Sequence, residues 1–545
     1  MKQIEMVIKL SIITILFSSS LVFGQTQPST PKESSGLTSD EAIAKMERFL
    51  EILDAKYMDD VDEGKLVEDA INAVLEKLDP HSVYFTEEEL VEANQPLEGN
   101  FEGVGIQFNI LKDTIIVVNT ISGGPSEKVG VMSGDKIVII DGENVASIGI
   151  TTTGVTDRLR GKKGTEVNVA IVRKGIKKNL EFKITRDVIP LYSVDASYMS
   201  DPETGYIRVS KFAATTTEEF QAAIAELQKE GMKNLILDLR GNGGGYMNAA
   251  IDMADEFLDA GKLIVYQEGK AYPRQDAYST SLGMIHEGKV IVLIDEGSAS
   301  ASEIVTGALQ DWDRALVIGR RSFGKGLVQR PFNLPDGSAM RLTVSRYFTP
   351  SGRSIQKSYE EGVEKYHDDI TNRYKDGELF ADSMYHYPDS LKYYTKNSNR
   401  LVYGGGGIMP DIFIPLDTTW VSDYYSEVVG KGIVNQFALT YVNENRETLN
   451  KKYTGQTDFA KGFNVDGAIW KDFFAYAEND SIKYSEEQFK QCEEKLSVLL
   501  ESSIARNLYG FEAFWYVYNI ADEAYIKALE ALHDNTFKKM KIAAQ

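Results

Sequence analysis

Three short stretches of this sequence carry residues that can act together on a carbonyl group. The first is DLRGNGGG at 238–245, which follows an apolar run and precedes a helical pattern. A glycine-rich turn between a strand and a helix exposes backbone N–H groups to an anion, and this turn lacks the Gly-Lys-Ser/Thr ending of a phosphate-binding loop. We interpret it as an oxyanion hole, in which fixed amides meet the charge that develops on a carbonyl oxygen. A tight structural turn would give the same pattern.

The second stretch supplies hydroxyl groups. It is GSASASE at 297–303, just after the apolar run at 290–294, and its small residues allow a strand to turn sharply into a helix. A serine at this point lies at the positive end of the helix dipole. Ser298, Ser300 and Ser302 are each a candidate nucleophile, and each could equally be an N-cap.

The third stretch supplies a candidate base. In SFGKGLVQ at 322–329, Lys325 stands between two glycines, and in an extended segment Lys325 and Gln329 point to the same face. To act as a base the lysine must be neutral, so its pKa must fall from about 10.4 to near 7, which costs roughly 4 kcal/mol. Burial beside Phe323 and Leu327 would lower the pKa by desolvation, and Gln329 could orient the amine without adding charge. Most lysines are instead solvated surface residues.

Histidine is the usual base for a catalytic serine, but the 5 histidines are poorly placed for that role. His81 belongs to the N-terminal helices, His367 and His386 to a polar insertion, and His533 to the C-terminal region. His286, which precedes a core strand, is the one serious alternative. A Ser-Lys dyad is a known variant of the triad.

The elements around these stretches predict a layered α/β core over 187–357, with a return strand in 401–417. Apolar runs expected to be strands alternate with helical patterns, an arrangement typical of a sheet covered by helices. The runs are 206–212, 234–239, 289–294 and 315–318. Residues 358–400 are polar and rich in Tyr and Asp, with no clear period, and we interpret them as an insertion.

Residues 101–186 have a different pattern, in which short strands alternate with glycine-containing turns. A small helix, a Gly-Asp turn at 134–135, a buried strand and an Asp-Gly hairpin closely resemble a PDZ domain. In PDZ domains a loop corresponding to Gly103, Val104, Gly105 and Ile106 points N–H groups at the terminal carboxylate of a peptide, which adds a strand to the sheet. The alternative is a small β-domain that only packs.

Both ends of the chain beyond these regions are expected to be helical. Residues 39–100 carry apolar side chains at helical spacing, and so do residues 418–545. The second region includes Phe514, Trp515 and Tyr518, an aromatic stripe that favours core packing and could also form a homo-oligomer interface.

The first 24 residues are predicted to be a cleavable signal peptide. Lys2 and Lys9 precede a mostly apolar stretch at 12–23, and Gly24 is small enough for a cleavage site. Residues 25–38 form a Pro/Ser-rich linker. A short membrane anchor is the alternative, although the apolar stretch is shorter than the roughly 20 residues needed. With no cysteine after the stretch for lipid attachment, we expect a periplasmic or secreted protein with at most peripheral membrane association.

Composition narrows the functional classes. A chain of 545 residues suggests several domains. Acidic residues outnumber basic ones by 81 to 59, giving a net charge of −22, which argues against nucleic-acid binding. The single cysteine, Cys492, excludes an internal disulfide framework and a Cys-rich metal site. We therefore expect no metal ion and no cofactor.

Taken in chain order, the three stretches resemble the carboxy-terminal processing proteases, the tail-specific serine proteases of the periplasm and cell exterior. The resemblance runs from about residue 40 to 417 and includes LDPHS at 78–82 and YFTPSGR at 347–353. It implies an α+β multidomain protein with an N-terminal helical segment, a β-rich PDZ domain, a crotonase/ClpP-like layered α/β protease core and a helical C-terminal extension. The insertion and the extension depart from the family, whose members are mostly shorter.

The resemblance also assigns roles to residues. The nucleophile is the middle serine, Ser300, and the base is the lysine 25 residues later, Lys325. Gln329 assists the base, and Asp311 matches an acidic residue that recurs in some members. The oxyanion amides would come from Ala301 and from either Gly243 or Gly244.

The function implied is that of a serine endopeptidase that recognises free, apolar substrate C-termini through its PDZ domain and processes or degrades envelope or secreted proteins. Arg160, at the end of a PDZ helix, either links the occupied PDZ domain to the core or is a solvated helix-end residue. One alternative is a non-catalytic PDZ scaffold, which the intact set of Ser300, Lys325 and Gln329 argues against. Another is a crotonase-type acyl-CoA enzyme, which the signal peptide and PDZ domain argue against because CoA is cytoplasmic.

Overall fold

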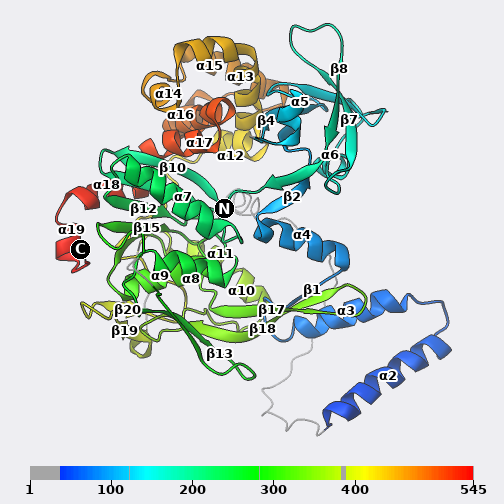
Figure 1. Ribbon diagram of the computed structural model, residues 1–545, viewed down its shortest axis with the longest axis vertical. Coiled ribbons are helices and arrows are strands. Elements are labelled where there is room, and N and C mark those ends of the chain that lie inside the picture. Colours follow the sequence, from blue (N-terminus) through cyan, green and yellow to red (C-terminus); the bar gives the residue numbers. More distant parts are fainter. Residues whose placement is uncertain (1–36, 122, 281–282, 382–387, 544–545) are drawn as a thin grey trace. The chain divides into compact units, whose positions relative to one another are not determined.

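The computed structural model describes residues 37–121, 123–280, 283–381 and 388–543 (Figure 1). The predicted signal peptide lies outside the described residues, as does all but the end of the linker. The chain divides into two compact units, one of Met1–Glu87 with Gln329–Thr343 and the other of Glu88–Val328 with Val344–Gln545.

In the first unit, helices α2 (Ser39–Lys56) and α3 (Glu63–Leu75) precede the short strand β1 (Val83–Phe85). β1 pairs antiparallel with β18 (Ala339–Phe348), which also pairs with β17 (Leu327–Asn333). The LDPHS sequence forms the turn before β1. There the Asp79 carboxylate accepts hydrogen bonds from the N–H of Ser82 (2.9 Å) and from its hydroxyl (2.6 Å), and Ser82 Oγ accepts from Thr343 N (3.1 Å).

The second unit contains the predicted layered core, which is confirmed. Its six-stranded sheet has the order β10-β11-β12-β15-β16-β21, and all neighbours are parallel except β10 and β11. The strands are β10 (Val194–Asp201), β11 (Thr204–Val209), β12 (Asn234–Asp238), β15 (Val290–Ile294), β16 (Ala315–Gly319) and β21 (Ile412–Phe413). Nearly every residue of β12, β15 and β16 is buried, as expected for strands covered on both faces.

Alternate residues of these strands enter two different hydrophobic clusters. Leu235 and Leu237 pack with helices α7 (Thr216–Lys229), α8 (Met247–Asp255) and α9 (Ala301–Asp311). Ile236, which points to the opposite face, packs with α18 (Glu523–His533) near the C-terminus. The extension therefore supplies one layer of the protease core. A second, smaller sheet in this unit pairs β13 (Leu263–Glu268) with β14 (Gln275–Tyr278) and with the end of β18.

The PDZ region follows α4 (Glu87–Glu98). Its sheet has the order β3-β4-β5-β7-β8, with β6 paired to β5, so β3 lies at an edge. A separate ladder joins β2 to β9, and α5 and α6 complete the region. The bounds are β2 (Asn100–Gly103), β3 (Ile106–Ile110), β4 (Ile115–Thr120), α5 (Pro125–Val129), β5 (Lys136–Ile140), β6 (Glu143–Asn144), α6 (Thr152–Leu159), β7 (Glu166–Val172), β8 (Leu180–Thr185) and β9 (Asp187–Pro190).

The insertion, for which the sequence predicted no regular element, contains several short ones. They are α10 (Val363–His367), α11 (Asp369–Lys375), the 3₁₀ helix η2 (Asp389–Leu391) and the hairpin β19 (Lys392–Tyr394)–β20 (Leu401–Tyr403). Buried ion pairs hold this region, among them Arg321–Glu378 (2.6 Å) and Arg373–Asp369 (2.9 Å). Polar pairs of this kind leave no apolar periodicity in the sequence, which explains why the elements were not predicted.

The C-terminal extension is helical, as predicted. Its helices are α12 (Asp423–Gly430), α13 (Ile433–Lys452), α14 (Gln456–Gly462), α15 (Gly467–Asn479), α16 (Glu486–Tyr509), α17 (Phe511–Tyr518), the 3₁₀ helix η3 (Asn519–Ala521), α18 and α19 (Thr536–Lys539). Aromatic residues such as Phe437 and Phe473 fill a core of its own. Among the residues described, no helix is long and apolar enough to cross a membrane.

Candidate active site

Ser300 lies where the chain turns from the carboxyl end of β15 into α9, at the N-cap position of that helix. Its backbone has φ 57° and ψ −112°, a conformation that residues other than glycine rarely adopt. Strained backbone of this kind is concentrated at functional sites, where the surrounding structure enforces it. The side chain is half-buried.

The glycine-rich stretch packs directly against this serine. A Cβ atom on Gly244, whose φ is +101°, would lie 2.8 Å from Ser300 Cβ and 3.0 Å from Ala301 N. Asn242 fixes the two segments together, because its carbonyl oxygen accepts from Ala299 N (2.9 Å) and from Ser302 Oγ (2.8 Å). The first two stretches identified in the sequence therefore meet.

The backbone amides of this turn are not equally available. Gly244 N–H donates to the side-chain oxygen of Asn242 (2.9 Å). Within the part of the chain that the structure describes, Gly243 N–H and Ala301 N–H donate to no protein atom. Gly243 is exposed, and Ala301 is the first residue of α9. Both N–H groups therefore remain available as hydrogen-bond donors beside Ser300.

Glu303 joins the serine to the third stretch. Its side chain is buried, and Oε2 accepts from Ser300 N and from Lys325 N, each at 2.8 Å. Oε1 accepts from Gly324 N (2.8 Å) and from the Ser322 hydroxyl (2.5 Å). Burial raises the pKa of this carboxyl, although the hydrogen bonds oppose the rise. One carboxylate therefore holds the backbone on both sides of the candidate dyad.

Tyr347 makes a second link between the same two residues. Its hydroxyl lies 2.6 Å from the carbonyl oxygen of Lys325 and 2.9 Å from that of Ser300. The tyrosine is buried, and burial raises its pKa well above the ordinary value, which keeps the hydroxyl a donor. Ser300 and Lys325 are neighbours in space because Glu303 holds their amides and Tyr347 their carbonyls.

The insertion supports the loop that carries Lys325. The guanidinium of Arg373, on α11, donates to the carbonyl oxygens of Ser322 (2.9 Å) and Phe323 (3.1 Å). Lys357 N donates to the carbonyl oxygen of Gly324 (2.9 Å), and its side-chain nitrogen lies 3.8 Å from the centre of the Phe323 ring. Neither the insertion nor Glu303 was assigned a role from the sequence. The one local signal for Glu303 was its position three residues after a helix N-cap, which is the capping-box position.

The other predicted residues have contacts of their own. Asp311 is at the far end of α9, about 16 Å along the helix from Ser300, and forms a buried ion pair with Arg353 (2.9 Å). Gln329 belongs to the first unit, where its side-chain amide donates to the carbonyl oxygen of His81. His286 precedes the amino end of β15, whereas Ser300 follows the carboxyl end.

The predicted peptide-binding loop connects β2 to the edge strand β3. Val104 O accepts from Ser126 N (3.0 Å), and Gly105, with φ +73°, uses its carbonyl oxygen to accept from Ile121 N. Ile106 packs against the PDZ hydrophobic cluster. The free edge of β3 provides the backbone groups to which a peptide strand could add.

Arg160 adjoins this loop. A Cβ atom on Gly103 would lie 3.7 Å from the Cα of Arg160. The Arg160 guanidinium donates to the side-chain oxygen of Gln95 on α4 (2.7 Å) and lies 4.9 Å from the centre of the Phe101 ring. Arg160 therefore connects the PDZ loop to the helix that leads into the PDZ region. In the described residues, no cluster of His, Cys, Asp and Glu could hold a metal ion.

Comparisons with known proteins match the regions seen in the structure. Residues 203–366 match peptidase family S41, residues 103–184 a PDZ domain, residues 16–89 the N-terminal domain of the activating protease CtpB, and residues 424–510 a family of unknown function. A carboxy-terminal-processing protease of Bartonella bacilliformis is 38% identical over 347 residues, which cover 63% of this chain and 78% of that protein. The carboxy-terminal processing protease CtpA of Bacillus subtilis is 34% identical over a region that covers 65% of this chain and 76% of that protein. Among solved structures, a photosystem II D1 C-terminal processing protease is 30% identical over 58% of this chain and 86% of that one, with a TM-score of 0.33.

Proposed function

We propose that Ser300 and Lys325 form the catalytic dyad of this protein, because the chain belongs to the carboxy-terminal processing proteases of peptidase family S41. It is therefore a serine peptidase with a PDZ domain. The observation that carries this proposal is the pair of links through Glu303 and Tyr347, which bring the two residues together. The conformation of Ser300 adds support, since it presents the hydroxyl at a sharp turn between strand and helix.

In this mechanism the neutral amine of Lys325 accepts the proton of the Ser300 hydroxyl as Oγ attacks the scissile carbonyl carbon. The oxygen of the tetrahedral intermediate accepts hydrogen bonds from Gly243 N–H and Ala301 N–H. The lysine ammonium then protonates the leaving amine, and an acyl-enzyme ester remains on Ser300. Lys325 next removes a proton from water as the water oxygen attacks the acyl carbon of the ester. When the bond between that carbon and Ser300 Oγ breaks, the lysine ammonium returns the proton to Oγ and the carboxylic acid product leaves.

Two predicted residues would support this chemistry without reacting. Gln329, four residues after Lys325 on an extended segment, would orient the lysine amine, a role that rests on sequence spacing and family resemblance. Asp311 would act at a distance, because its ion pair with Arg353 holds the segment that follows Tyr347.

The PDZ domain would select substrates by a free, apolar C-terminus. The loop containing Gly103 and Gly105 would bind the carboxylate, β3 would pair with the substrate strand, and Ile106 would contact the end residue. Arg160 would transmit occupancy of this loop to α4. Signal-peptide cleavage would place the enzyme in the periplasm or outside the cell, where it would process or degrade envelope or secreted proteins.

The test is cleavage of one protein that ends in Leu-Ala-Ala, in Asp-Asp or in a C-terminal amide. We expect cleavage of the first only, and no cleavage by the Ser300→Ala, Lys325→Ala and Lys325→Arg variants, since an arginine does not lose its proton. Near-normal turnover by Lys325→Ala, or loss of activity in His286→Ala, would refute the dyad. Equal rates on all three substrates would refute C-terminal selection and leave the dyad standing.

A further inference from the structure

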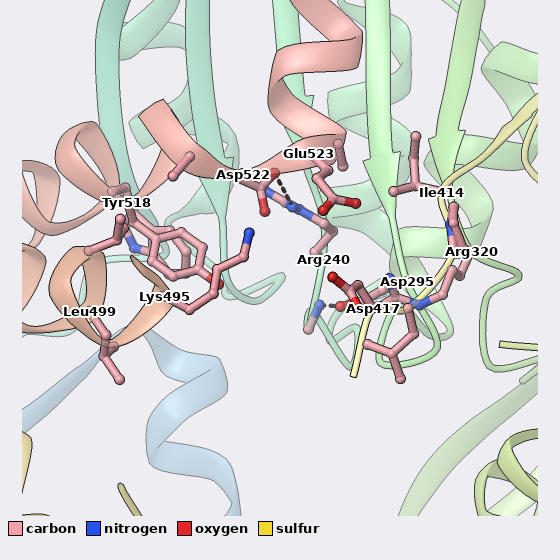
Figure 2. Close-up of a pocket in the computed structure, with 18 of the residues that line it drawn as sticks. Arg240, Asp295, Arg320, Ile414, Asp417, Lys495, Leu499, Tyr518, Asp522 and Glu523 are labelled. Carbon is pink, nitrogen blue, oxygen red and sulfur yellow. Dashed lines mark hydrogen bonds and ion pairs between the residues drawn. The ribbon is translucent and has the colours of Figure 1, made fainter. Parts of the chain in front are cut away.

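The C-terminal extension reaches the end of the strand that leads into the oxyanion turn. β12 ends at Asp238, and Arg240 opens the turn. The Arg240 guanidinium lies between two carboxylates, that of Asp238 (2.7 Å) and that of Asp522 in the extension (2.8 Å; Figure 2). The side chains of Arg240 and Asp522 are each 15% exposed, so water screens the pair only weakly.

Arg208 on β11 makes a second link to the extension. Its guanidinium lies 3.8 Å from the centre of the Trp515 ring on α17, contacts Asp238 (3.1 Å) and donates to the carbonyl oxygen of Arg240 (2.9 Å). The four charged groups form a balanced set of two arginines and two aspartates. Asp238 and Asp522 are the carboxylates in contact with Arg240, so a neutral side chain at position 522 would leave this guanidinium with one carboxylate partner instead of two.

These contacts border a cavity of about 520 Å³ between the strand ends and helices α16 to α18. Tyr518 and Leu499 line one side of the cavity, and Ile414 and Arg320 the other (Figure 2). Because the space is not filled by side chains, close packing does not fix Arg240 on that side. Without the charge on Asp522, the Arg240 guanidinium would keep its contacts with Asp238 but would have room to shift toward the cavity.

We propose that Asp522 is a positioning residue which, through Arg240, fixes the oxyanion turn, so that the C-terminal extension takes part in stabilising the transition state. The turn begins at Arg240, whose N–H donates to Asp238 (2.9 Å), continues with Gly241 N–H held by Asp295 (2.8 Å), and then reaches Gly243. Oxyanion donors are effective only when they are held in place beforehand. A loosened turn therefore lowers kcat and leaves KM nearly unchanged.

This inference rests on the proposed function, and the experiment separates the two. Asp522→Asn removes the charge but keeps the volume and the N-cap of α18, in which the Asp522 side chain accepts from Tyr525 N (2.8 Å). We expect kcat for the substrate ending in Leu-Ala-Ala to fall about tenfold, below the roughly 10²- to 10³-fold loss that removal of an oxyanion donor causes. Asp522→Glu, which keeps the charge, should recover most of the rate.

Asp201→Asn is the matched control. Asp201 also pairs with the extension, through His533 (3.0 Å), and also accepts from backbone N–H groups, but it lies beside the amino end of β11, away from the turn. We expect its kcat and KM to match the wild type. Thermal unfolding of each variant shows whether the extension remains folded.

Wild-type kcat in Asp522→Asn, with Ser300→Ala inactive, would overturn the inference and leave the proposed function intact. Equal losses in Asp522→Asn and Asp201→Asn, together with lower unfolding temperatures, would also overturn it, because they would indicate general loosening of the extension. Activity in Ser300→Ala would refute the proposed function itself.

Discussion

Replacing Glu303 by glutamine tests whether a carboxylate outside the dyad holds the active site together. Two donors converge on each carboxylate oxygen, so an amide nitrogen in place of one oxygen would face two donors. Only the Oε1 position can adapt, because the Ser322 hydroxyl on that side can rotate and accept instead of donating. The amide oxygen should therefore remain with Ser300 N and Lys325 N, and Gly324 N–H should lose its partner.

The expected loss of stability follows from the number of N–H groups left without an acceptor. One buried N–H group left without a partner costs about 1–3 kcal/mol. The substitution also removes the desolvation penalty that raises the pKa of Glu303, so the loss of stability should lie at the lower end of this range. Glu303→Ala leaves the N–H groups of Ser300, Gly324 and Lys325 without an acceptor and should cost several times more. A displacement of about 1 Å between the reacting groups can slow a reaction about a hundredfold.

The assay combines urea unfolding with kcat and KM for the substrate ending in Leu-Ala-Ala. We expect Glu303→Gln to keep measurable activity, and Glu303→Ala to lose nearly all activity together with stability. A stable Glu303→Gln enzyme as inactive as Ser300→Ala would refute this reasoning, since the negative charge itself would then be required. Wild-type kcat in Glu303→Ala would also refute it, because the active site would then not need Glu303 to hold its backbone.

Two further predictions concern a glycine and a buried lysine. Gly244→Ala should reduce kcat about a hundredfold, because the new Cβ would lie 2.8 Å from Ser300 Cβ, whereas Gly430→Ala, which has no atom within 4 Å, should match the wild type; equal rates for the two would contradict the close approach. Burial lowers the pKa of Lys357 from 10.5 to about 8, against the pull of Asp369. Between those pH values the unfolded chain holds a proton that the folded chain has released, so this lysine makes the free energy of unfolding rise with pH. Urea midpoints at pH 8 and pH 10 should rise more in the wild type than in Lys357→Gln, and an identical change would show that Lys357 is not the cause.

The sequence revealed the parts of the site that depend on local pattern. An apolar run, a turn of small residues and a helical pattern predict a strand end followed by a helix start, and the carboxyl ends of parallel strands meet at one edge of a sheet. This geometry explains why the stretches at 238–245 and 297–303 meet in the structure, although their joint role was inferred from the family resemblance. The layered α/β core and the helical extension were predictable from local pattern, whereas the PDZ segment was identified by its resemblance to PDZ domains.

The contacts that hold the site were not predictable, because they join residues far apart in the chain. Glu303 reaches Lys325, Arg373 of the insertion reaches the carbonyl of Ser322, and Asp522 reaches Arg240 across 282 positions. A single hydrogen bond or ion pair imposes no period on the sequence. The insertion and the extension, which interrupt or follow the family pattern, therefore gave no sign of their contacts with the stretches at 322–329 and 238–245.

The boundary placed at 417 and 418 illustrates the limit of reading domains from composition. The sequence changes there from strands to helices, but the hydrophobic core crosses the boundary. Tyr206, Ile236 and Ile318 on one face of the protease sheet pack with residues of α18 such as Tyr525. Without the extension this apolar face would be exposed to water, which would cost about 25 cal/mol of folding free energy for each Å² of apolar surface. The extension is therefore part of the folded protease core, and a layer that the core needs for stability is well placed to support its oxyanion turn as well.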